Sequence, residues 1–370
     1  MKFVVITHVV HKKVGSNFQA YAPYVLEMNR WFNYVDAVKI VAPANIDYAS
    51  KIAAAYQHKQ LDFVEVPQFS LLSVRSVFTT LLKLPIISYT IWKSMKWADH
   101  IHLRCPGNMG LLGSMIQVFF PSKAKTVKYA GNWDPNSKQP WSYKLQKWII
   151  SNTFLSKNMK VLVYGDWPEQ TKNIKSFFTA SFSENECVHI DDKIIENQVR
   201  FIFVGSLVEG KRPLEAIKIV QSLKLKGINA VLELYGEGSL KESLQSYIIE
   251  NNLSDIIKLC GVIPLELLKR KYQEAHFSIL PSKSEGWPKA VAEAMFFNCV
   301  PIATPVSCVP WMLNYGKRGI VMDQNFDKNI AKIDGVIKDP LVYNDMAKEA
   351  GDWSRTYTLE YFEAEIYKLL

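Results

Sequence analysis

The sequence predicts an α/β protein with two doubly wound domains, and three observations carry this prediction. Short, continuously apolar runs alternate with longer amphipathic stretches along the 370 residues. Apolar strands of this kind are typical of parallel sheets that helices cover on both faces. The alternation occurs twice, and a chain of this length usually forms about two domains.

The first series of predicted strands comprises Phe3–Ile6, Ala37–Val41, Ile101–Leu103, Thr126–Tyr129 and Val161–Tyr164. The second series comprises Phe201–Val204, Val231–Tyr235, Ile257–Leu259, Phe277–Leu280 and Val300–Ala303. The amphipathic stretches predict helices that include Ala20–Phe32, Pro213–Leu225, Leu240–Asn251, Pro264–Gln273 and Ala290–Phe297.

Residues 181–197 are polar and weakly periodic, which indicates a linker. We therefore place the first domain at residues 1–190 and the second at residues 196–354. The last segment, Leu359–Leu370, predicts a short amphipathic helix.

The chain carries a net charge of +9 and a pI of about 9.1. A basic excess suits nucleotides, diphosphates or an anionic membrane surface, although it can also serve solubility alone. Nucleic-acid binding is not indicated, because the lysines and arginines are dispersed and no binding motif occurs.

The cysteines favour a reducing compartment and buried thiols, because their number is odd and no C-x-x-C pair occurs. They are Cys105, Cys187, Cys260, Cys299 and Cys308. The start, Met1–Thr7, predicts a buried strand and not a signal peptide. No run of 18 apolar residues predicts a membrane span. We expect a cytoplasmic protein.

Residues 74–98 contain an apolar stretch that is followed by Lys93 and Lys96. Such a segment could dock on a membrane interface, which would make the protein peripheral at the inner membrane face. A packed helix of the first domain is the favoured alternative, with Pro85 interrupting it.

Two glutamates, Glu285 and Glu293, flank the predicted start of a helix. Pro288 suits the first helical position, and the residues after it are mostly good helix formers. The free N–H groups at that helix start attract an anion. A phosphate there, with hydroxylated groups on either side, would use both carboxylates. A capping carboxylate and a solvated carboxylate are the plainer interpretation.

This stretch resembles the Glu-x7-Glu motif of the retaining glycosyltransferases of family 4. These enzymes have the GT-B fold, in which two Rossmann-like domains face a central cleft and the C-terminal helix crosses back, here residues 355–370. The resemblance implies that Glu285 binds hydroxyls of the donor sugar and that Glu293 binds the nucleotide ribose.

A second family feature follows the strand at Phe201–Val204. Gly205 and Ser206 form a turn, and Lys211 and Arg212 precede a helix start. The resemblance implies that this basic pair contacts the donor diphosphate. Family members often carry arginine at the position of Ser206, so Arg212 is expected to replace that contact. A surface basic pair is the alternative.

Other turns occur in the family's order along the second domain. Gly236 belongs to a G-x-G turn that lacks the third glycine of a dinucleotide fingerprint. The resemblance implies that this turn lines the nucleotide and that Val262 borders the base. The remaining donor-binding candidates are Gly286, Trp287, Pro288 and Lys289.

The first domain resembles the family less closely. Gly15 and Ser16 stand where relatives carry a glycine pair that reaches the donor phosphate, although Ser16 could instead cap the next helix. His102 and Arg104 share one strand face and could line the acceptor pocket. A hydrogen-bonded core histidine is the more common role for His102. Asn132 and Trp133 replace a histidine of many relatives and are further acceptor candidates.

The resemblance implies transfer of a sugar, with retention, from a UDP- or GDP-linked donor to a saccharide or lipid-linked acceptor in surface polysaccharide or glycolipid biosynthesis. Lys211 and Arg212 are catalytic candidates, because positive charge must meet the leaving diphosphate, and Glu285 is the third, from its implied contact with the donor sugar. No Asp-x-Asp cluster of the metal-binding kind occurs, so we expect neither a metal nor a cofactor. An epimerase of the same fold and a non-catalytic nucleotide-sugar-binding protein are the alternatives.

Overall fold

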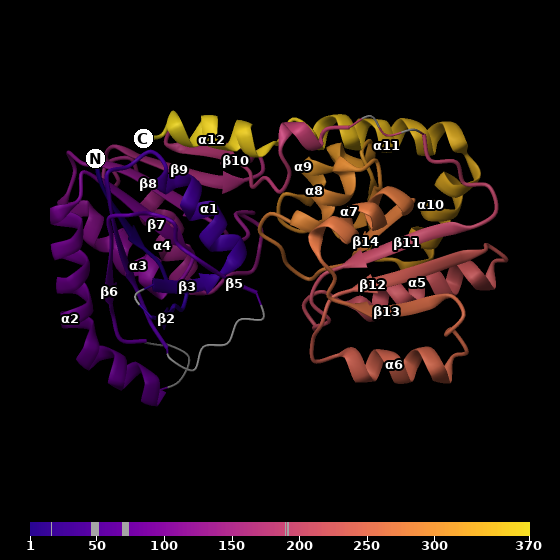
Figure 1. Cartoon of the computed structure of the whole chain (residues 1–370), viewed down its shortest axis with the longest axis horizontal. Helices are drawn as coiled ribbons and strands as arrows, with labels where there is room; N and C mark the ends of the chain where they lie inside the picture. The colour runs from indigo at the N-terminus through magenta and orange to yellow at the C-terminus, as the bar shows by residue number, and fades with distance from the viewer. Residues whose placement is uncertain (16, 46–51, 69–73, 189, 191) are drawn as a thin grey trace. The chain divides into compact units, whose positions relative to one another are not determined.

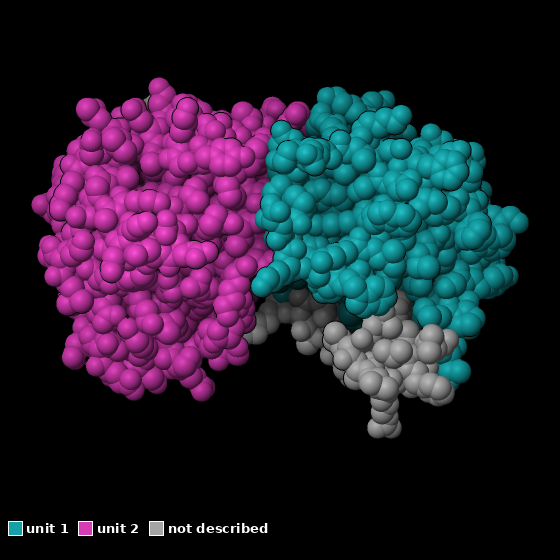
Figure 2. Space-filling view, turned by 180° about the vertical axis from the view of Figure 1, so that it is seen from behind, with its two compact units in different colours: residues 1–177, 363–370 teal, residues 178–362 magenta. Residues whose placement is uncertain are grey.

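The computed structural model describes residues 1–15, 17–45, 52–68, 74–188, 190 and 192–370, which form two α/β units (Figure 1). Unit 1 comprises Met1–Phe177 and Glu363–Leu370, and unit 2 comprises Phe178–Phe362 (Figure 2). The division falls before the linker that the sequence suggested at 181–197. Phe182 lies in that segment, yet it is buried in the core of unit 2 against Phe296 and Phe297.

Unit 1 is built on a seven-stranded parallel sheet in the order β10-β9-β8-β7-β1-β4-β6. The strands are β1 (Lys2–Ile6), β4 (Ala37–Ala42), β6 (Leu61–Glu65), β7 (His100–Cys105), β8 (Ala124–Tyr129), β9 (Met159–Tyr164) and β10 (Ile174–Phe177). All five strands predicted for this half are confirmed. The two that were missed, β6 and β10, are edge strands whose partial exposure allows charged residues to interrupt the apolar run.

A small antiparallel sheet follows β1 and corrects the predicted start of the first helix. It consists of β2 (Lys12–Val14), β3 (Asn17–Tyr21) and β5 (Ala53–Ala55). Helix α1 therefore spans Ala22–Phe32 instead of beginning at Ala20. Gly15 lies between β2 and β3 with a φ of 62°, in a region that glycine enters easily. The glycine thus serves a hairpin and does not precede a helix; Ser16 lies outside the described residues.

The other helices of unit 1 are α2 (Val74–Trp97), α3 (Asn108–Ile116), the 3₁₀ helix η1 (Gln117–Phe119) and α4 (Trp141–Ser151). Pro85 was expected to interrupt α2, but the helix continues through it. Ile87, Ile91 and Met95 of α2 are fully buried in the unit 1 core, as the packed-helix alternative predicted.

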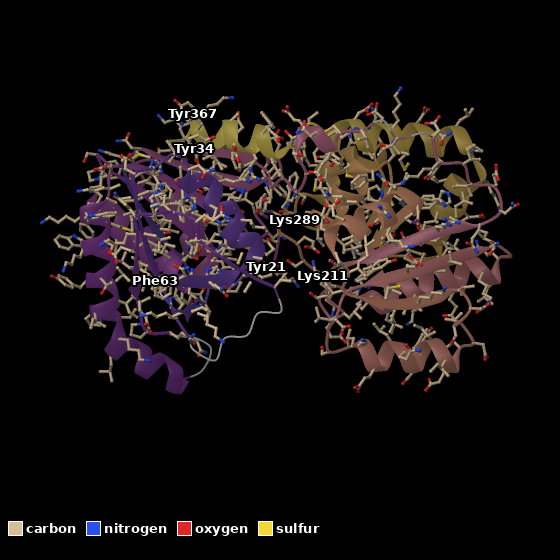
Figure 3. All side chains as sticks on the ribbon, viewed as in Figure 1. Tyr21, Tyr34, Phe63, Lys211, Lys289 and Tyr367 are labelled. Atoms are coloured by element: carbon tan, nitrogen blue, oxygen red, sulfur yellow. The ribbon has the colours of Figure 1, made fainter. Side chains whose placement is uncertain are left out.

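Helix α12 (Leu359–Tyr367) is divided between the two units, because the boundary follows Phe362. Its last residues contact unit 1. Lys175 Nζ donates to Glu365 Oε2 at 2.5 Å, and Arg30 pairs with Glu363. The rings of Tyr34 and Tyr367 lie 5.5 Å apart (Figure 3).

Unit 2 holds a six-stranded parallel sheet in the order β13-β12-β11-β14-β15-β16. Its strands are β11 (Val199–Val204), β12 (Ala230–Tyr235), β13 (Ile257–Gly261), β14 (Phe277–Leu280), β15 (Val300–Ala303) and β16 (Ile320–Val321). Its helices are α5 (Pro213–Leu225), α6 (Lys241–Glu250), α7 (Leu265–Glu274), α8 (Lys289–Phe296), α9 (Val309–Met312), α10 (Phe326–Lys338) and α11 (Pro340–Ser354), with 3₁₀ turns η2 (Glu184–Glu186) and η3 (Asn314–Gly316). The five predicted strands of this half are confirmed.

Each sheet has one point where the strand order reverses direction. In unit 1 the next strands after β1 are added on one side, and β7 begins the other side. In unit 2 the same reversal separates β11 and β14. Ligands of open α/β sheets bind beyond the carboxyl ends of the strands at such switch points. The loops after β11 and β14 are therefore the first place to seek a site in unit 2.

Buried histidines make the stability of the fold depend on pH. Thr126 Oγ1 lies 2.9 Å from His100 Nε2 and 2.9 Å from His102 Nδ1, and all three side chains are fully buried. Burial lowers the pKa of His100 to about 4, and burial and the charges of neighbouring groups hold the pKa of His102 well below its usual value. The unfolded chain therefore binds more protons than the folded chain between about pH 6.5 and pH 4.

We expect the melting temperature to fall as the pH is lowered from 7.5 to 5. His100 alone should contribute a loss of about 2 kcal/mol of unfolding free energy at pH 5. His100→Gln removes this titration, so the difference in stability between the two pH values should shrink by that amount, even though the variant is less stable at pH 7.5. Chemical denaturation at both pH values measures the effect. An undiminished difference in the variant would contradict it.

Candidate functional site

Two loops meet at the switch point of unit 2. We call residues 205–212 the β11 loop and residues 281–288 the β14 loop. The amide of Lys283 donates to the carbonyl oxygen of Gly210 at 2.8 Å, which joins the loops through the backbone. The loops also meet through side chains: Lys211 Nζ lies 2.5 Å from Glu285 Oε1. Sequence reasoning named both residues, and the structure brings them together.

The Lys211–Glu285 pair is partly shielded from water. The Glu285 side chain is 8% exposed, whereas that of Lys211 is 30% exposed. A charge-assisted hydrogen bond of this length is among the stronger polar contacts. Because Lys211 remains accessible, a phosphate oxygen can approach it, and Glu285 can accept hydrogen bonds from a neighbouring hydroxyl.

Arg212 has a strained backbone at the start of α5. Its φ and ψ are 52° and 48°, a left-handed conformation that costs a non-glycine residue of the order of 1 kcal/mol or more. Its side chain pairs with Glu215 at 3.2 Å and is 37% exposed. Strained residues of this kind cluster at functional sites. The left-handed turn ends the β11 loop directly after Lys211 and begins the helix.

Glycines bring the loops after β11 and β12 into direct backbone contact. A Cβ atom on Gly236 would lie 1.9 Å from the carbonyl oxygen of Gly205, and its φ is 148°. A Cβ atom on Gly238 would lie 2.2 Å from the carbonyl oxygen of Leu207. The turn that was predicted to line the nucleotide therefore supports the β11 loop. Ser206 is exposed beside it, and Val262 is 65% exposed after β13.

Helix α8 begins at Lys289, one residue after Pro288, which suited the first helical position, and one residue before the start of the predicted range Ala290–Phe297. Pro288 occupies the N-cap position with a ψ of 86°, and Lys289 is the first helical residue. Figure 3 labels Lys211 and Lys289, which lie toward the same end of unit 2. The β14 loop leads into this helix, so the amides of its first two residues, Lys289 and Ala290, and two lysines occupy one region. That combination suits an anion.

Other residues hold the β14 loop in place, and sequence reasoning missed them. Ser307 Oγ and Cys308 Sγ donate to the carbonyl oxygen of Gly286 at 3.0 and 3.3 Å. Thr304 Oγ1 donates to the carbonyl oxygen of Ser282 at 2.5 Å. These residues follow β15, and the proline-rich composition of that segment gave no sign of which hydroxyls turn toward the loop.

Trp287 anchors the same loop in an aromatic cluster. It is only 7% exposed, and its ring lies 6.2 Å from that of Trp353 and 5.8 Å from that of Tyr357. The Trp287 side chain was predicted to bind the donor. In the structure most of its surface is packed against α11 and the residues after it, so little of it remains for a ligand. We assign Trp287 to positioning of the loop.

Glu293 lies in α8, four residues after Lys289, the first residue of the helix. Its carboxylate contacts two hydroxyl groups. Ser181 Oγ donates to its Oε1 at 2.7 Å, and Tyr272 OH lies 3.5 Å from its Oε2. Burial raises the pKa of the Glu293 carboxyl, while the Ser181 hydroxyl and the charge of Lys289 act in the opposite direction. Neither partner was predicted, because Ser181 falls in the apparent linker.

The acceptor candidates on β7 occupy a covered face of the sheet. His102 and Arg104 do share one strand face, but α1 packs on it. The His102 ring lies 4.8 Å from the Trp31 ring and is fully buried, and Arg104 pairs at 3.1 Å with the buried Glu27. His102 is therefore a core residue, as the alternative held, and lines no surface of the unit.

The acceptor candidates after β8, Asn132 and Trp133, also make contacts within unit 1. Trp133 is 7% exposed and packs edge-on against Tyr129 at 4.8 Å, so it offers no face for a sugar to stack on. Asn132 is half-buried, and its Oδ1 accepts from the amide of Asp134 at 2.8 Å. This side chain shapes its own loop.

A cavity of about 480 Å³ lies instead at the carboxyl ends of the unit 1 strands. Residues that follow β1, β4, β6 and β7 line it, together with the start of α4. Its lining includes His8, Gly107, Asn108, Trp141 and Tyr143. Although part of His8 is exposed to solvent, desolvation by the surrounding loops and the nearby charge of Arg104 lower the pKa of its imidazole, which favours the neutral form. Sequence reasoning missed this cavity, because its walls come from five separate loops.

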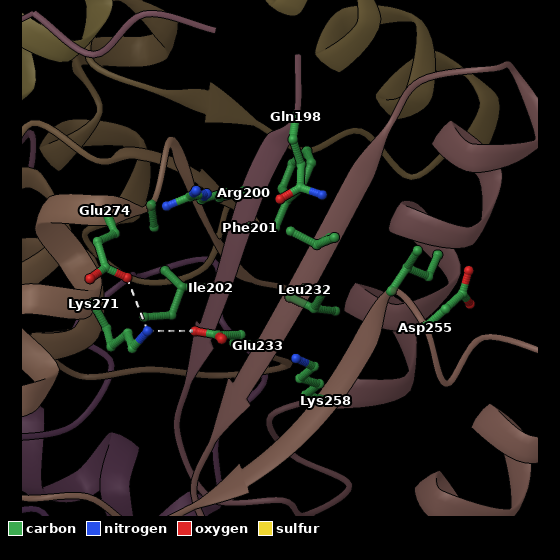
Figure 4. A pocket seen from close by; sticks show the side chains of 13 residues that line it. Gln198, Arg200, Phe201, Ile202, Leu232, Glu233, Asp255, Lys258, Lys271 and Glu274 are labelled. Carbon is green, nitrogen blue, oxygen red and sulfur yellow. Dashed lines mark hydrogen bonds and ion pairs between the residues drawn. The ribbon is translucent and has the colours of Figure 1, made fainter. Parts of the chain in front are cut away.

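A second cavity, of about 360 Å³, lies on the sheet of unit 2 (Figure 4). Gln198, Asp255 and Ala275 line it, and each precedes a strand, so it sits toward the amino ends. Lys271 in its wall is already paired with Glu233 at 3.6 Å and Glu274 at 2.9 Å. Because ligands of such sheets bind at the opposite ends of the strands, we do not assign the donor to this cavity.

Within the described ranges, no three His, Cys, Asp or Glu side chains gather as a metal site would require. Across the same residues, no helix is long and apolar enough to cross a membrane. The five thiols are free, and Cys105, Cys299 and Cys308 are buried as expected, whereas Cys187 is exposed.

Residues 188–353 match the family described as "Glycosyl transferases group 1". The chain is 28% identical over 145 residues to the amylovoran biosynthesis glycosyltransferase AmsK of Erwinia amylovora, covering 38% of this chain and 36% of that protein. It is 27% identical over 146 residues to the capsular polysaccharide biosynthesis glycosyltransferase CapH of Staphylococcus aureus, covering 38% of each. The chain thus spans little more than a third of the length of these relatives. The resemblance drawn from the sequence motifs is confirmed over this region.

Solved structures match nearly the whole chain. A structure of Anabaena HepE in complex with UDP has a TM-score of 0.70 at 12% identity and covers 99% of this chain and 98% of that one. Sucrose-phosphate synthase from Thermosynechococcus elongatus has a TM-score of 0.67 at 14% identity and covers 100% of this chain and 98% of that one. At these identities the likeness shows the fold alone, and it confirms the predicted GT-B class.

Proposed function

We propose that this chain, whose residues 188–353 match the family described as "Glycosyl transferases group 1", transfers a sugar from a nucleoside diphosphate to a saccharide acceptor. One observation carries the proposal: the Lys211–Glu285 pair of 2.5 Å at the switch point of unit 2, beside the start of α8. A cation, a carboxylate and free helix amides at one place match a ligand that joins a diphosphate to a hydroxylated ring.

Unit 2 would hold the donor. Lys211 and the first amides of α8 would face the diphosphate, with Arg212 as a further cation at the edge of the loop. Negative charge grows on the diphosphate as the glycosidic bond breaks, and fixed positive groups stabilise that charge. Glu285 would accept hydrogen bonds from the sugar hydroxyls.

Glu293 is proposed to bind the ribose of the donor. Its carboxylate is held by Ser181 and Tyr272 and would exchange part of that bonding for the ribose hydroxyls. Val262, exposed after β13, is proposed to border the base. Gly15, which is exposed in its hairpin, is proposed to reach the donor phosphate, and this role rests on the family resemblance alone.

The cavity of about 480 Å³ in unit 1 is the proposed acceptor site. Trp141 lines it and is 69% exposed, so it offers an aromatic face on which a sugar can stack. AmsK is named for amylovoran biosynthesis and CapH for capsular polysaccharide biosynthesis, which supports surface polysaccharide as the product class.

The finer features of the reaction are also proposals. Retention of the anomeric configuration rests on the family resemblance. UDP is the favoured carrier, since the structure of HepE holds UDP, and GDP is the alternative. The charge on the leaving diphosphate would be met by protein groups, and we propose a reaction that needs no metal ion or other cofactor.

Thermal stabilisation by nucleotides tests the donor site. UDP or GDP at 100 times its dissociation constant should raise the unfolding free energy by about 2.7 kcal/mol. The shift should survive EDTA and should weaken in Glu293→Ala. The matched control is Glu250→Ala, an exposed glutamate on a helix of the same unit.

Incubation with radiolabelled UDP-sugars and candidate acceptors then tests the reaction. Stabilisation by UDP with no transfer to any acceptor would indicate a binding protein, and donor turnover without an acceptor would indicate an epimerase or a hydrolase. A folded sample that no nucleoside diphosphate stabilises would contradict the assignment of the site.

A further inference from the structure

We propose that the outer side of helices α2, α3 and α4 in unit 1 is a docking face for an anionic phospholipid bilayer. The docking face is defined by exposed apolar side chains and by the lysines among them. Its apolar members are Leu82, Ile86, Tyr89, Trp92, Phe119, Trp148 and Phe154. Its lysines are Lys83, Lys93, Lys96, Lys144 and Lys157.

Connectivity places the three helices in one layer. Helices α2, α3 and α4 each lead to a strand farther along the same direction of the unit 1 sheet, and such crossovers are right-handed. They must therefore cover the same face of the sheet. Helix α3 contacts both α2 and α4, so their outer sides form one continuous surface.

The apolar side chains follow helical periodicity on the side away from the core. On α2, Leu82, Ile86 and Tyr89 recur at intervals of four and three residues and are 72%, 62% and 62% exposed. The opposite side of that helix buries Ile87, Ile91 and Met95. A helix with an apolar side toward the core and a second apolar stripe toward solvent needs a further partner for the stripe.

The surface continues onto the next elements. Phe119 of η1 is 75% exposed, Trp148 of α4 is 60% exposed, and Phe154, just after α4, is 76% exposed. These segments are tied together: Gln117 Nε2 donates to Ser156 Oγ at 2.9 Å. Large aromatic side chains with this exposure are favoured where protein meets the headgroup region of a bilayer.

Charge complementarity selects the partner. From residue 66 to residue 165 the sequence has thirteen lysines and arginines and only two acids, Asp99 and Asp134, a net charge of +11. The whole chain carries +9, so the remaining residues together are slightly acidic. Lys125 and Lys128 are fully buried and Arg104 is paired with Glu27, but the same segment also holds the five exposed lysines of the docking face beside the apolar stripe.

Lysines and apolar groups alternate within the docking face. Lys144 lies one helical turn before Trp148 on the outer side of α4, and Lys96 Nζ lies 5.2 Å from the centre of the Trp92 ring. The Lys157 ammonium lies 5.3 Å from the centre of the Phe154 ring. Basic and apolar groups in one plane fit lipid headgroups above acyl chains. A protein partner would not require the even spread of cations, and a second copy of this chain would set like charges against each other.

Sedimentation of the full chain with vesicles tests the proposal and needs neither donor nor acceptor. Vesicles of phosphatidylcholine with phosphatidylglycerol should bind the protein at low salt, vesicles of phosphatidylcholine alone should bind it weakly, and added salt should release it. Lys93→Gln, Lys96→Gln and Lys144→Gln together should lower the partition coefficient on the order of 100-fold, about fivefold for each lysine. The matched control replaces Lys218, Lys226 and Lys317, which are exposed on unit 2.

Leu82→Gln with Ile86→Gln should lower binding by more than 100-fold, because each apolar side chain that leaves water contributes a factor of roughly 10 or more. Leu225→Gln with Leu341→Gln is the matched control, since both leucines are exposed on helices of unit 2 at 83% and 78%. Circular dichroism and nucleotide stabilisation confirm that each variant is folded.

Three outcomes would overturn the proposal. The first is that the wild-type protein does not bind anionic vesicles, and the second is that the control variants lose as much binding as the docking-face variants. The third is loss of binding in the variant of Lys93, Lys96 and Lys144 with no loss in the variant of Leu82 and Ile86, which would indicate a general polyanion-binding surface and not a bilayer-binding one. A change of oligomeric state in the variant of Leu82 and Ile86, measured by size-exclusion chromatography, would also contradict it, because the apolar stripe would then bind a second copy of this chain.

Discussion

Lys211→Ala is expected to lower the turnover number by roughly 10²–10³, the usual cost of losing one preplaced donor to a developing negative charge. The lysine projects from the loop after the central strand of unit 2 and remains accessible while it contacts Glu285. The bound diphosphate is already anionic and gains further negative charge as the bond breaks, so the loss should appear in the turnover number together with a smaller rise in the Michaelis constant of the donor.

Lys283→Ala is the matched control, because Lys283 lies in the neighbouring β14 loop and is 61% exposed at 3.8 Å from Glu209. It should retain turnover within a few-fold. Lys211→Arg keeps the charge but not the compact ammonium, and it should fall between the two. If Lys211→Ala and Lys283→Ala are equally active, the proposed role of Lys211 is wrong.

Gly236→Ala is expected to destabilise unit 2 by roughly 3 kcal/mol or more, and to abolish nucleotide binding in whatever remains folded. A Cβ atom at this position would lie 1.9 Å from the carbonyl oxygen of Gly205, a contact that only movement of the backbone can relieve. The φ of 148° adds strain for any other residue. Displacement of the β12 turn would also shift the β11 loop that carries Lys211.

Gly210→Ala provides the control within the same group of loops, because a Cβ atom there would meet no atom within 4 Å. This variant should keep its stability within about 1 kcal/mol of the wild type. Urea denaturation of both variants measures the difference. A Gly236→Ala protein as stable as Gly210→Ala would show that the two turns do not touch as described.

The sequence was sufficient for the central strands, because each is a short apolar run that helices bury on both sides. It was insufficient at the sheet edges, where Leu61–Glu65 mixes charged and apolar residues. It also missed the hairpin around Gly15, since a three-residue strand such as Lys12–Val14 leaves almost no periodic signal. Pro85 was wrongly expected to interrupt α2, because burial of the helix on the sheet outweighs one lost hydrogen bond.

The site was predictable where function depends on loops that follow strands with recognisable motifs at their carboxyl ends. Lys211 and Glu285 both follow strands that are neighbours in the sheet, so two residues that the sequence named separately come into contact. Glu293 met Ser181 across 112 positions of sequence, and no local pattern reveals such a pair. His102 failed as an acceptor candidate for a different reason: alternation along a strand identifies a shared face but does not say which face a helix covers.

Helix α12 has a practical consequence for anyone who wishes to dissect the molecule. Its first residues count with unit 2 and the remainder with unit 1, so the polypeptide passes between the halves twice, once in an extended segment and once inside a helix. No single cut yields two self-contained recombinant fragments. A clone that stops at Phe362 would lose the Glu365 carboxylate that Lys175 contacts, and a clone of the amino-terminal half would need the final eight residues, Glu363–Leu370, supplied through an engineered connection.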